Sequence, residues 1–257
     1  MSKITTAKLR KFNVFMAALH AAQGLIVLVI SKNFQLPVNG TYLQFNQLTQ
    51  SLEPTTTKLF NMHFVWLIAG FFFLSAAAHL IIATVYNKTY NANLAKGINK
   101  ARWIEYSISA STMIVAIAML VGVYDASSLV MLFGLTALMN LLGLVMETHN
   151  QKTDTLNWLS YWLGCLAGAI PWVVIAFYMW LGAANGSKAP TFVYWIYVSI
   201  FIFFNCFAIN MVLQYKKVGK WKDYMYGERA YIILSLVAKS LLAWQVFGGT
   251  LRDRKSV

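Results

Sequence analysis

The chain has 257 residues, of which 59% are hydrophobic and only 11% are charged, whereas a soluble domain carries about 25% charged residues. So little charge cannot cover the surface of a globular protein of this size, so many apolar side chains must face lipid. The composition excludes a soluble domain, a disordered chain and collagen. The formal net charge of +13 is typical of cationic loops that contact anionic lipid headgroups, and we expect no binding to nucleic acid.

Seven apolar segments are long enough to cross a bilayer, which takes about 20 helical residues. Apolar and polar residues do not alternate in these segments, as they would in the strands of a β-barrel, so helices are favoured. The apolar run of the first segment is too long for a secretory signal, and it contains no convincing cleavage site. We therefore expect this segment to be retained as a helix. The predicted spans are 9–30, 59–86, 98–123, 127–146, 158–181, 192–215 and 229–250. The predicted fold is an all-α membrane protein, a single seven-helix domain over residues 1–257.

The Lys and Arg residues concentrate on one side of this predicted bundle. The loops on the side of the amino terminus carry 14 of the 21, and the opposite loops carry six. Cationic loops remain in the cytoplasm during membrane insertion. We therefore predict a multi-pass protein of the cell membrane, with its amino terminus in the cytoplasm and its carboxyl terminus outside.

The first loop, residues 31–58, is the only long one and contains Pro37, Pro54 and the pair Asn39-Gly40 among alternating residues. An Asn-Gly pair favours a tight turn. We therefore predict a small β-hairpin outside the cell. Such a hairpin would serve as a lid or a subunit contact, and a solvated connector fits the loop equally well.

A lysine lies in the middle of the seventh predicted span. Lys239 comes 10 residues after Arg229 and 13 before Arg252, and its side chain is too short to reach either surface of a hydrocarbon layer about 30 Å thick. A charge at this depth is costly and marks a functional site, unless it serves only to pack helices. An amine in apolar surroundings is suited to condense with an aldehyde or ketone.

A buried ammonium group needs a carboxylate nearby. Glu105 is the only acidic residue of the third span, and Ser109 and Thr112 follow it on the same helical face. We expect Glu105 to be the partner of Lys239. The alternative is an interfacial Glu105 that pairs with Arg102, one turn earlier.

Other polar residues lie at similar depths in the first, second and seventh spans. His20 and His79, with Ser75 one turn before His79, would share a polar cavity and take up a proton, or would simply be hydrogen-bonded packing residues. Ser235, one turn before Lys239, would bond the lysine nitrogen or a carbonyl of its own helix.

Several further residues favour structural roles. Glu147, at the end of the fourth span, is expected to be an interfacial charge paired with Lys152 or with the basic sixth loop. Cys165 and Cys206 lie in apolar runs without the spacing of a disulfide framework or a metal site. Four residues of spans five and six would wall an elongated apolar ligand or fill the core: Trp162, Pro171, Trp172 and Phe204.

The segments RWIEYSISASTMIV, GERAYIILSLVAKSLLAWQVFGGTL, GCLAGAIPW and FIFFNCFA closely resemble heliorhodopsins, the rhodopsin family of inverted topology, and the similarity extends over residues 12–251. The resemblance implies all-trans retinal, bound covalently to Lys239 as a protonated Schiff base with Glu105 as its counterion. It also implies a homodimer with the hairpin outside the cell. The chain departs from the family pattern at Thr136 and Asn140, which bears on spectral tuning. Following the family pattern, the retinal surroundings would be Ser75, His20, His79, Ser235 and Tyr106 near the Schiff base, and Met139, Gly143, Trp162, Pro171 and Phe204 along the polyene or ring.

These features predict a photoreceptor with a slow photocycle and a signalling role, without enzymatic activity or a metal site. A proton pump of the common microbial type needs a second acid in span three, where Ser109 and Ala116 stand 4 and 11 residues after Glu105. A light-gated channel or transport regulator needs a polar path, which the apolar outer halves of spans three and seven disfavour. A non-retinal transporter is the alternative outside the family. The cytoplasmic signalling partner is unknown, and the basic loop 214–229 would contact lipid headgroups or an acidic protein.

Overall fold

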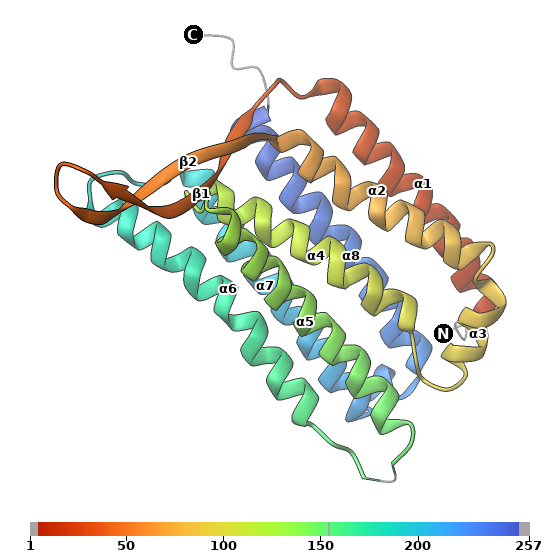
Figure 1. Ribbon diagram of the computed structural model, residues 1–257. Helices are drawn as coiled ribbons and strands as arrows, with labels where there is room; N and C mark the ends of the chain where they lie inside the picture. Colours follow the sequence, from red (N-terminus) through yellow and green to blue (C-terminus); the bar gives the residue numbers. More distant parts are fainter. Residues whose placement is uncertain (1–4, 154, 252–257) are drawn as a thin grey trace.

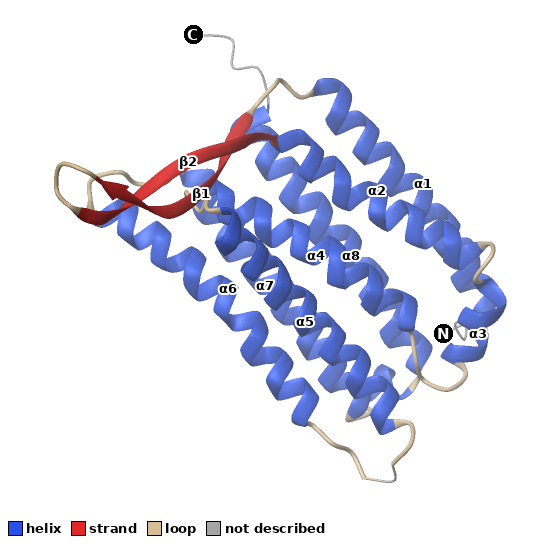
Figure 2. Cartoon of the chain, in the orientation of Figure 1, coloured by secondary structure: helices blue, strands red, loops and turns tan. Residues whose placement is uncertain are grey.

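The computed structural model describes residues 5–153 and 155–251, which form a bundle of long helices with a two-stranded antiparallel sheet at one end (Figures 1 and 2). Seven helices are long and apolar enough to cross a membrane, which confirms the predicted fold class. Three short elements complete this part of the chain: the α-helix α3 (Asn87–Leu94), the 3₁₀-helix η1 (Gly219–Lys222) and the π-helix η2 (Phe247–Leu251). The long helices are α1 (Thr6–Ile30), α2 (Phe64–Ala83), α4 (Lys100–Leu120), α5 (Ala126–Asn150), α6 (Leu159–Ala184), α7 (Thr191–Tyr215) and α8 (Tyr224–Val246).

Four of the long helices begin at residues whose side chains cap the first turn. Thr5, Asn99, Asp125 and Asp223 each accept a hydrogen bond from a backbone N–H of the following turn, which satisfies one of the groups that a helix start leaves unpaired. The caps of α4 and α8 matter most here, because these two helices carry Glu105 and Lys239.

Helix α4 lies in the centre of the bundle (Figure 1) and packs against α2, α5, α6 and α7. Its half nearer the hairpin is closely packed, with Met113, Ile117 and Met119 inside the main core. Helices α1 and α2 form one packed pair and α7 and α8 another. Large apolar side chains such as Val29, Val173 and Trp180 are exposed on the outer faces, which is what contact with lipid requires.

The hairpin consists of β1 (Gln35–Asn46) and β2 (Ser51–His63), and projects beyond the ends of the helices (Figure 2). It confirms the predicted strand pair but corrects its turn. The turn covers residues 47–50, with Gln50 at a φ of 51°. Asn39-Gly40 instead lies within β1, beside a register shift after Val38. There the backbone N–H of Asn39 donates to the carbonyl of Tyr124 at 2.8 Å, so the irregular strand anchors the hairpin to the α4–α5 loop.

The hairpin is also longer than predicted. Strand β2 continues to His63, so α2 begins at Phe64 and not at residue 59. Pro37 and Pro54 lie within the strands, opposite Asn61 and Leu43. A two-stranded sheet accepts both prolines because each strand is an edge strand.

The two ends of the bundle differ in what they carry. One end, called here the N-terminal end, holds the start of α1, the helix α3 and the first turns of α4, α6 and α8 (Figure 1). The other, called the hairpin end, holds the two strands and η2, where the backbone N–H of Lys32 donates to the carbonyl of Leu251 at 2.8 Å. The cytoplasmic location of the N-terminal end stays a prediction.

Candidate functional site

An ion pair lies inside the bundle between α4 and α8. Nζ of Lys239 is 3.2 Å from Oε1 of Glu105, and the two side chains are 3% and 10% exposed. Lys239 also donates to Oγ of Ser235 at 2.7 Å, and Ser75 on α2 donates to Oε1 of Glu105 at 2.6 Å. The expected pairing of Lys239 with Glu105 is therefore present, and the alternative pairing of Glu105 with Arg102 is wrong.

The aromatic ring of Tyr106 covers one side of this ion pair. Its centroid lies 5.3 Å from Nζ of Lys239, and its hydroxyl donates to the backbone carbonyl of Tyr231 at 2.9 Å. The electron-rich face of an aromatic ring attracts a cation. Tyr106 thus stabilises positive charge at Lys239 while its hydroxyl fixes the ring to α8.

The two predicted histidines lie together beside the ion pair. The rings of His20 and His79 stack with centroids 5.5 Å apart. Nδ1 of His79 bonds Oδ1 of Asn13 at 2.7 Å, whereas neither ring nitrogen of the fully buried His20 has a hydrogen-bond partner among the described residues. Asn13 was missed at the sequence level, although it lies seven residues before His20 and so on the same face of α1.

The predicted polar face of α4, formed by Glu105, Ser109 and Thr112, is only partly present. Ser109 is fully buried next to the site, but Thr112 bonds the carbonyl of Ile108 in its own helix at 2.9 Å. A hydroxyl that bonds its own helix contributes little to a site on a neighbouring helix.

Two adjacent cavities lie beside Lys239, the smaller between α4, α5, α7 and α8 and the larger between α4, α5, α6 and α7. The smaller, about 40 Å³, reaches Lys239, Ser235 and Tyr106, and the larger, about 220 Å³, continues towards α6 and α7. Four residues line both cavities: Met139, Asn140, Phe204 and Phe207. Together they outline an elongated, mostly apolar space with an amine at one end.

The residues expected to wall an elongated ligand line the cavities on α5 and α7, and on α6 Trp172 lines the larger cavity whereas Trp162 and Pro171 do not. Met139, Gly143 and Phe204 line the cavities. Trp162 is 65% exposed and lines neither cavity, and Pro171 is buried but also lines neither. Tyr161, the residue before Trp162, lines the larger cavity in its place, because one residue turns a helix by about 100°. The remaining α6 residues that line the larger cavity are Ser160, Gly164, Cys165, Gly168 and Ala169.

Glycines give this space its width. A Cβ atom on Gly143 would overlap the ring of Trp103, and one on Gly168 would overlap the sulfur of Met139. The two glycines thus allow large side chains from α4 and α5 to pack beside the cavity without filling it.

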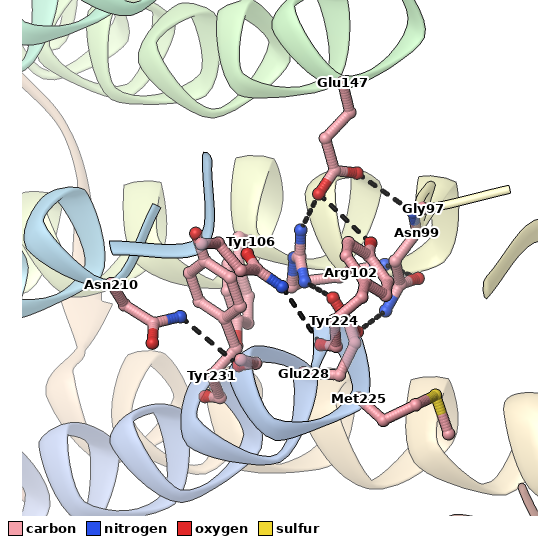
Figure 3. Close-up of polar contacts among 12 residues, drawn as sticks. Gly97, Asn99, Arg102, Tyr106, Glu147, Asn210, Tyr224, Met225, Glu228 and Tyr231 are labelled. Atoms are coloured by element: carbon pink, nitrogen blue, oxygen red, sulfur yellow. Dashed lines mark hydrogen bonds and ion pairs between the residues drawn. The ribbon is translucent and has the colours of Figure 1, made fainter. Parts of the chain in front are cut away.

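A second ionic cluster, whose three charged side chains are buried, lies nearer the N-terminal end (Figure 3). Arg102 on α4 pairs with Glu147 on α5 and with Glu228 on α8. Asn99 donates its backbone N–H to Glu147 at 2.9 Å and its amide to Glu228 at 2.6 Å. The hydroxyl of Tyr224 donates to Glu147 at 3.3 Å. These five residues are called the Arg102 cluster below.

The Arg102 cluster corrects two expectations. Glu147 is not an interfacial charge paired with Lys152: it is 2% exposed and pairs with Arg102, because α5 continues to Asn150 and keeps Glu147 inside the bundle. Arg102, one of the 14 cations that the sequence assigns to loops of the N-terminal side, is buried as well. Its guanidinium contacts two aromatic rings, 3.9 Å from the centroid of Tyr231 and 4.6 Å from that of Trp103.

Comparison with known proteins decides the family. The heliorhodopsin family model matches residues 9–251. The chain belongs to the heliorhodopsin family. Among solved structures, a light-driven proton pump, LR (Mac) from Leptosphaeria maculans, is similar in fold, with a TM-score of 0.62 and 15% sequence identity over 97% of each chain. No curated protein matches the chain.

Membership of the heliorhodopsin family supports a retinal photoreceptor in a lipid bilayer. The residues of this chain fit such a group. Retinal is an elongated apolar molecule with an aldehyde at one end, and the two cavities join an aromatic channel to a buried amine with a carboxylate beside it. Ligand cavities of this kind are mostly apolar, with a few polar groups that fix orientation.

Proposed function

We propose that the chain is a light-absorbing photoreceptor in which all-trans retinal is held covalently by Lys239, with Glu105 as the counterion. The observation that carries the proposal is the buried 3.2 Å ion pair, whose lysine lines the smaller of two connected cavities with aromatic walls. Both cavities include aromatic side chains, among them Phe204 and Phe207, that suit an extended polyene.

Retinal held through an imine to Nζ of Lys239 would supply visible absorption and light-driven isomerisation. The residues around Lys239 would balance the positive charge at Nζ and bind the proton that Nζ carries. Glu105 balances the positive charge at Nζ in surroundings of low dielectric, where a close pair interacts strongly. Ser75 fixes the carboxylate that faces Nζ. Glu105 is the first acceptor within reach of a proton that leaves Nζ, and the rings of His79 and His20 lie beside it.

We further propose a sensory role with a slow photocycle in place of pumping. Helix α4 carries no acid besides Glu105, so it lacks the second carboxylate that would resupply a proton. The hairpin half of α4 and α8 is packed with apolar side chains such as Ile117 and Leu242, which disfavours a channel. The solved neighbour is a pump, but a likeness at 15% identity concerns the fold alone.

The orientation and assembly belong to the same proposal. We place the N-terminal end in the cytoplasm, because the loops of this end are the richer in Lys and Arg even without the buried Arg102. A homodimer with the hairpin outside the cell follows from the family resemblance. The signalling partner would meet the cytoplasmic surface, where the basic segment 214–229 also suits lipid headgroups.

Replacing Glu105 with glutamine shifts the visible band to longer wavelength, on the order of tens of nanometres. The carboxylate stabilises positive charge at Nζ in the ground state. Excitation moves this charge along the polyene, away from the carboxylate. Loss of the carboxylate therefore narrows the gap between the ground and excited states. The measurement is an absorption spectrum of the purified protein with all-trans retinal. Glu53→Gln, which neutralises a carboxylate of the hairpin, outside the helix bundle, is the control and leaves the band in place. An unchanged maximum in Glu105→Gln contradicts the counterion role, and a parent protein that stays colourless contradicts the whole proposal.

Two tryptophans of α6 provide a matched pair for the ligand cavity. Trp172→Ala reduces the fraction of protein that becomes coloured with retinal and shifts the band, because Trp172 is 5% exposed and lines the larger cavity. Trp162→Ala changes neither quantity, since its side chain is on the outer face. The comparison requires spectra at equal protein and retinal concentrations. Equal effects of the two substitutions contradict this placement of the cavity.

A further inference from the structure

A separate pocket lies at the N-terminal end, away from the two cavities beside Lys239. It has a volume of about 150 Å³. Gly97 of the α3–α4 loop and Gln151, which follows α5, line one part of it. The segment that connects α7 with α8 supplies the rest of the wall. The lining residues from this segment are Gln214, Tyr215, Lys217, Trp221, Lys222 and Tyr224.

The charge that faces this pocket is positive. Lys217 and Lys222 line it with exposed side chains, and no described acidic residue lines it. The acid nearest to them in sequence, Asp223, accepts the backbone N–H of Met225 at 3.0 Å and so caps the start of α8. Two ammonium groups at one concave site attract an anion.

Lys217 occupies a backbone position that usually carries glycine. It lies two residues after the end of α7, with a φ of 52°. Its backbone N–H donates to the carbonyl of Gln214 at 3.2 Å, and that of Val218 donates to the carbonyl of Leu213 at 3.1 Å. This pair of bonds is a Schellman motif, in which the left-handed residue is most often glycine because a side chain is strained there. Backbone stability therefore does not account for a lysine at this position, whereas contact with an anion does.

Aromatic side chains form the remaining wall of the pocket. The indole of Trp221 is held in place, because its Nε1 donates to Oδ1 of Asn210 at 2.6 Å and its ring meets that of Tyr226 edge to face, with centroids 5.0 Å apart. Tyr215 and Tyr224 also line the pocket. Aromatic surface beside ammonium groups suits a ligand that joins an anionic group to an apolar or planar part.

The pocket adjoins the interior of the bundle through Tyr224. The hydroxyl of Tyr224 donates to Glu147 at 3.3 Å, and the charge of Glu147 is already paired with Arg102. That carboxylate therefore does not cancel the positive charge of the two lysines. A ligand in this pocket would touch the ends of α5, α7 and α8 at once.

We propose that this pocket binds a phosphate monoester, whose phosphate group is held by Lys217 and Lys222 and whose organic part lies against Trp221. Such an ester carries a charge of about −1.5 to −2 at neutral pH, which matches two ammonium groups, and lysine binds phosphate as a compact point charge. The ester is a small soluble molecule or a lipid headgroup, since both present the same group. The pocket is separate from the retinal site, so this inference does not depend on the proposed function.

The test measures binding of phenyl phosphate to the full chain in nanodiscs of phosphatidylcholine. The phosphorus NMR linewidth of the probe, followed over a titration, gives its dissociation constant. The test variant Lys217→Gly/Lys222→Gln removes the two lining cations. The matched control Lys216→Gln/Lys220→Gln removes two exposed cations of the same segment that do not line the pocket. Both variants have the same net charge, so a difference between them is not an effect of overall charge.

We expect the parent and the control to bind the probe, and the test variant to bind it roughly tenfold more weakly or worse, because charge-assisted hydrogen bonds are lost. Glycine relieves the left-handed position, so the test variant unfolds at a temperature no lower than the parent, which separates loss of the ligand from loss of the fold. A parent that does not bind the probe overturns the proposal. Equal weakening in the two double variants overturns it too, because that result shows only attraction to a basic surface.

Nanodiscs with a fraction of phosphatidic acid, whose headgroup is a phosphate monoester, identify the source of the ligand. If headgroups reach the pocket, phosphatidic acid weakens binding of the probe to the parent more than the same fraction of phosphatidylglycerol, which is an anionic diester. If the natural ligand is soluble, the two lipids act alike. Either result supports the pocket as a phosphate site, given that the parent binds the probe.

A second measurement uses the parent alone. Acetic anhydride labels exposed lysines, and mass spectrometry reports the extent of labelling at each one. Saturating phenyl phosphate slows the labelling of Lys217 and Lys222 severalfold and leaves that of Lys216 and Lys220 unchanged. Labelling that is the same at all four lysines with and without the probe overturns the proposal.

Discussion

Lys239→Ala abolishes the visible absorption band of the protein supplied with all-trans retinal. Lys239 is the only lysine that lines either of the two cavities, so no other described amine is placed to form the bond. Without the bond there is no cation for Glu105 to stabilise, and absorption returns to the near-ultraviolet region of free retinal. The expected effect is complete loss, measured on membranes or purified protein at equal protein concentration.

The controls for this loss are Lys188→Ala and Ser235→Ala. Lys188 is an exposed lysine of the α6–α7 loop, and its removal leaves the band unchanged. Ser235→Ala removes one hydrogen-bond partner of Nζ but keeps the amine, so the band persists, displaced in wavelength. A circular dichroism spectrum verifies that Lys239→Ala is still helical. A band of parental intensity in a folded Lys239→Ala protein contradicts the assignment of the anchor.

Arg102→Met destabilises the protein by about 3 to 5 kcal/mol, because it leaves two buried carboxylates without their cation. The side chains of Glu147 and Glu228 are 2% and 0% exposed, and methionine preserves most of the packing volume. The measurement is the free energy of unfolding in a mild detergent, or the midpoint of thermal unfolding.

Two comparisons separate lost charge pairing from lost packing. Lys100→Met removes an exposed cation and changes stability by less than about 0.5 kcal/mol. The neutral triple variant Arg102→Gln/Glu147→Gln/Glu228→Gln loses less stability than Arg102→Met, since it leaves no unpaired charge in the interior. If Arg102→Met is as stable as Lys100→Met, the cluster does not hold the bundle together.

The sequence was sufficient to pair Lys239 with Glu105, and the reason is the solvent. Lipid penalises every charge in the interior, so the few that remain in the middle of spans carry information. The argument weakened near the helix ends, where a charge in the interior and one at the interface look alike. Glu147 and Arg102 fell in that zone, and only the packing of α4, α5 and α8 shows that they are buried.

The rotational orientation of α6 was harder to predict than its position. In a soluble helix, the contrast between polar and apolar faces shows which side is buried. Lipid and the bundle core are both apolar, so α6 offers no such contrast. That explains why Trp162 was assigned to the cavity that Trp172 and Tyr161 actually line. The small residues Gly164 and Gly168, spaced by one turn, were a usable signal for the inner face.

The hairpin turn was misplaced for a different reason. Asn-Gly favours positive φ angles wherever they are needed. Here the true turn is made by 47–50, without glycine, and Asn39-Gly40 instead accompanies an irregularity inside β1. The signal was physically sound, but the contact between Asn39 and the α4–α5 loop could not be read from the sequence of the loop itself.

The two ion pairs between α4 and α8 together form a triangulated brace. Glu228 and Lys239 are 11 residues apart on α8, roughly 16 Å along the helix, whereas Arg102 and Glu105 are only three residues apart on α4, roughly 4.5 Å. Because the two ion pairs converge from distant points of α8 on neighbouring points of α4, together they resist sliding of one helix along the other. When the Lys239–Glu105 pair breaks, the Arg102–Glu228 pair is the one of the two that still joins α4 and α8. The Arg102–Glu228 pair then holds only the first turns of α8, and the apolar core around Leu242 and Val246 keeps the other half of the helix in place.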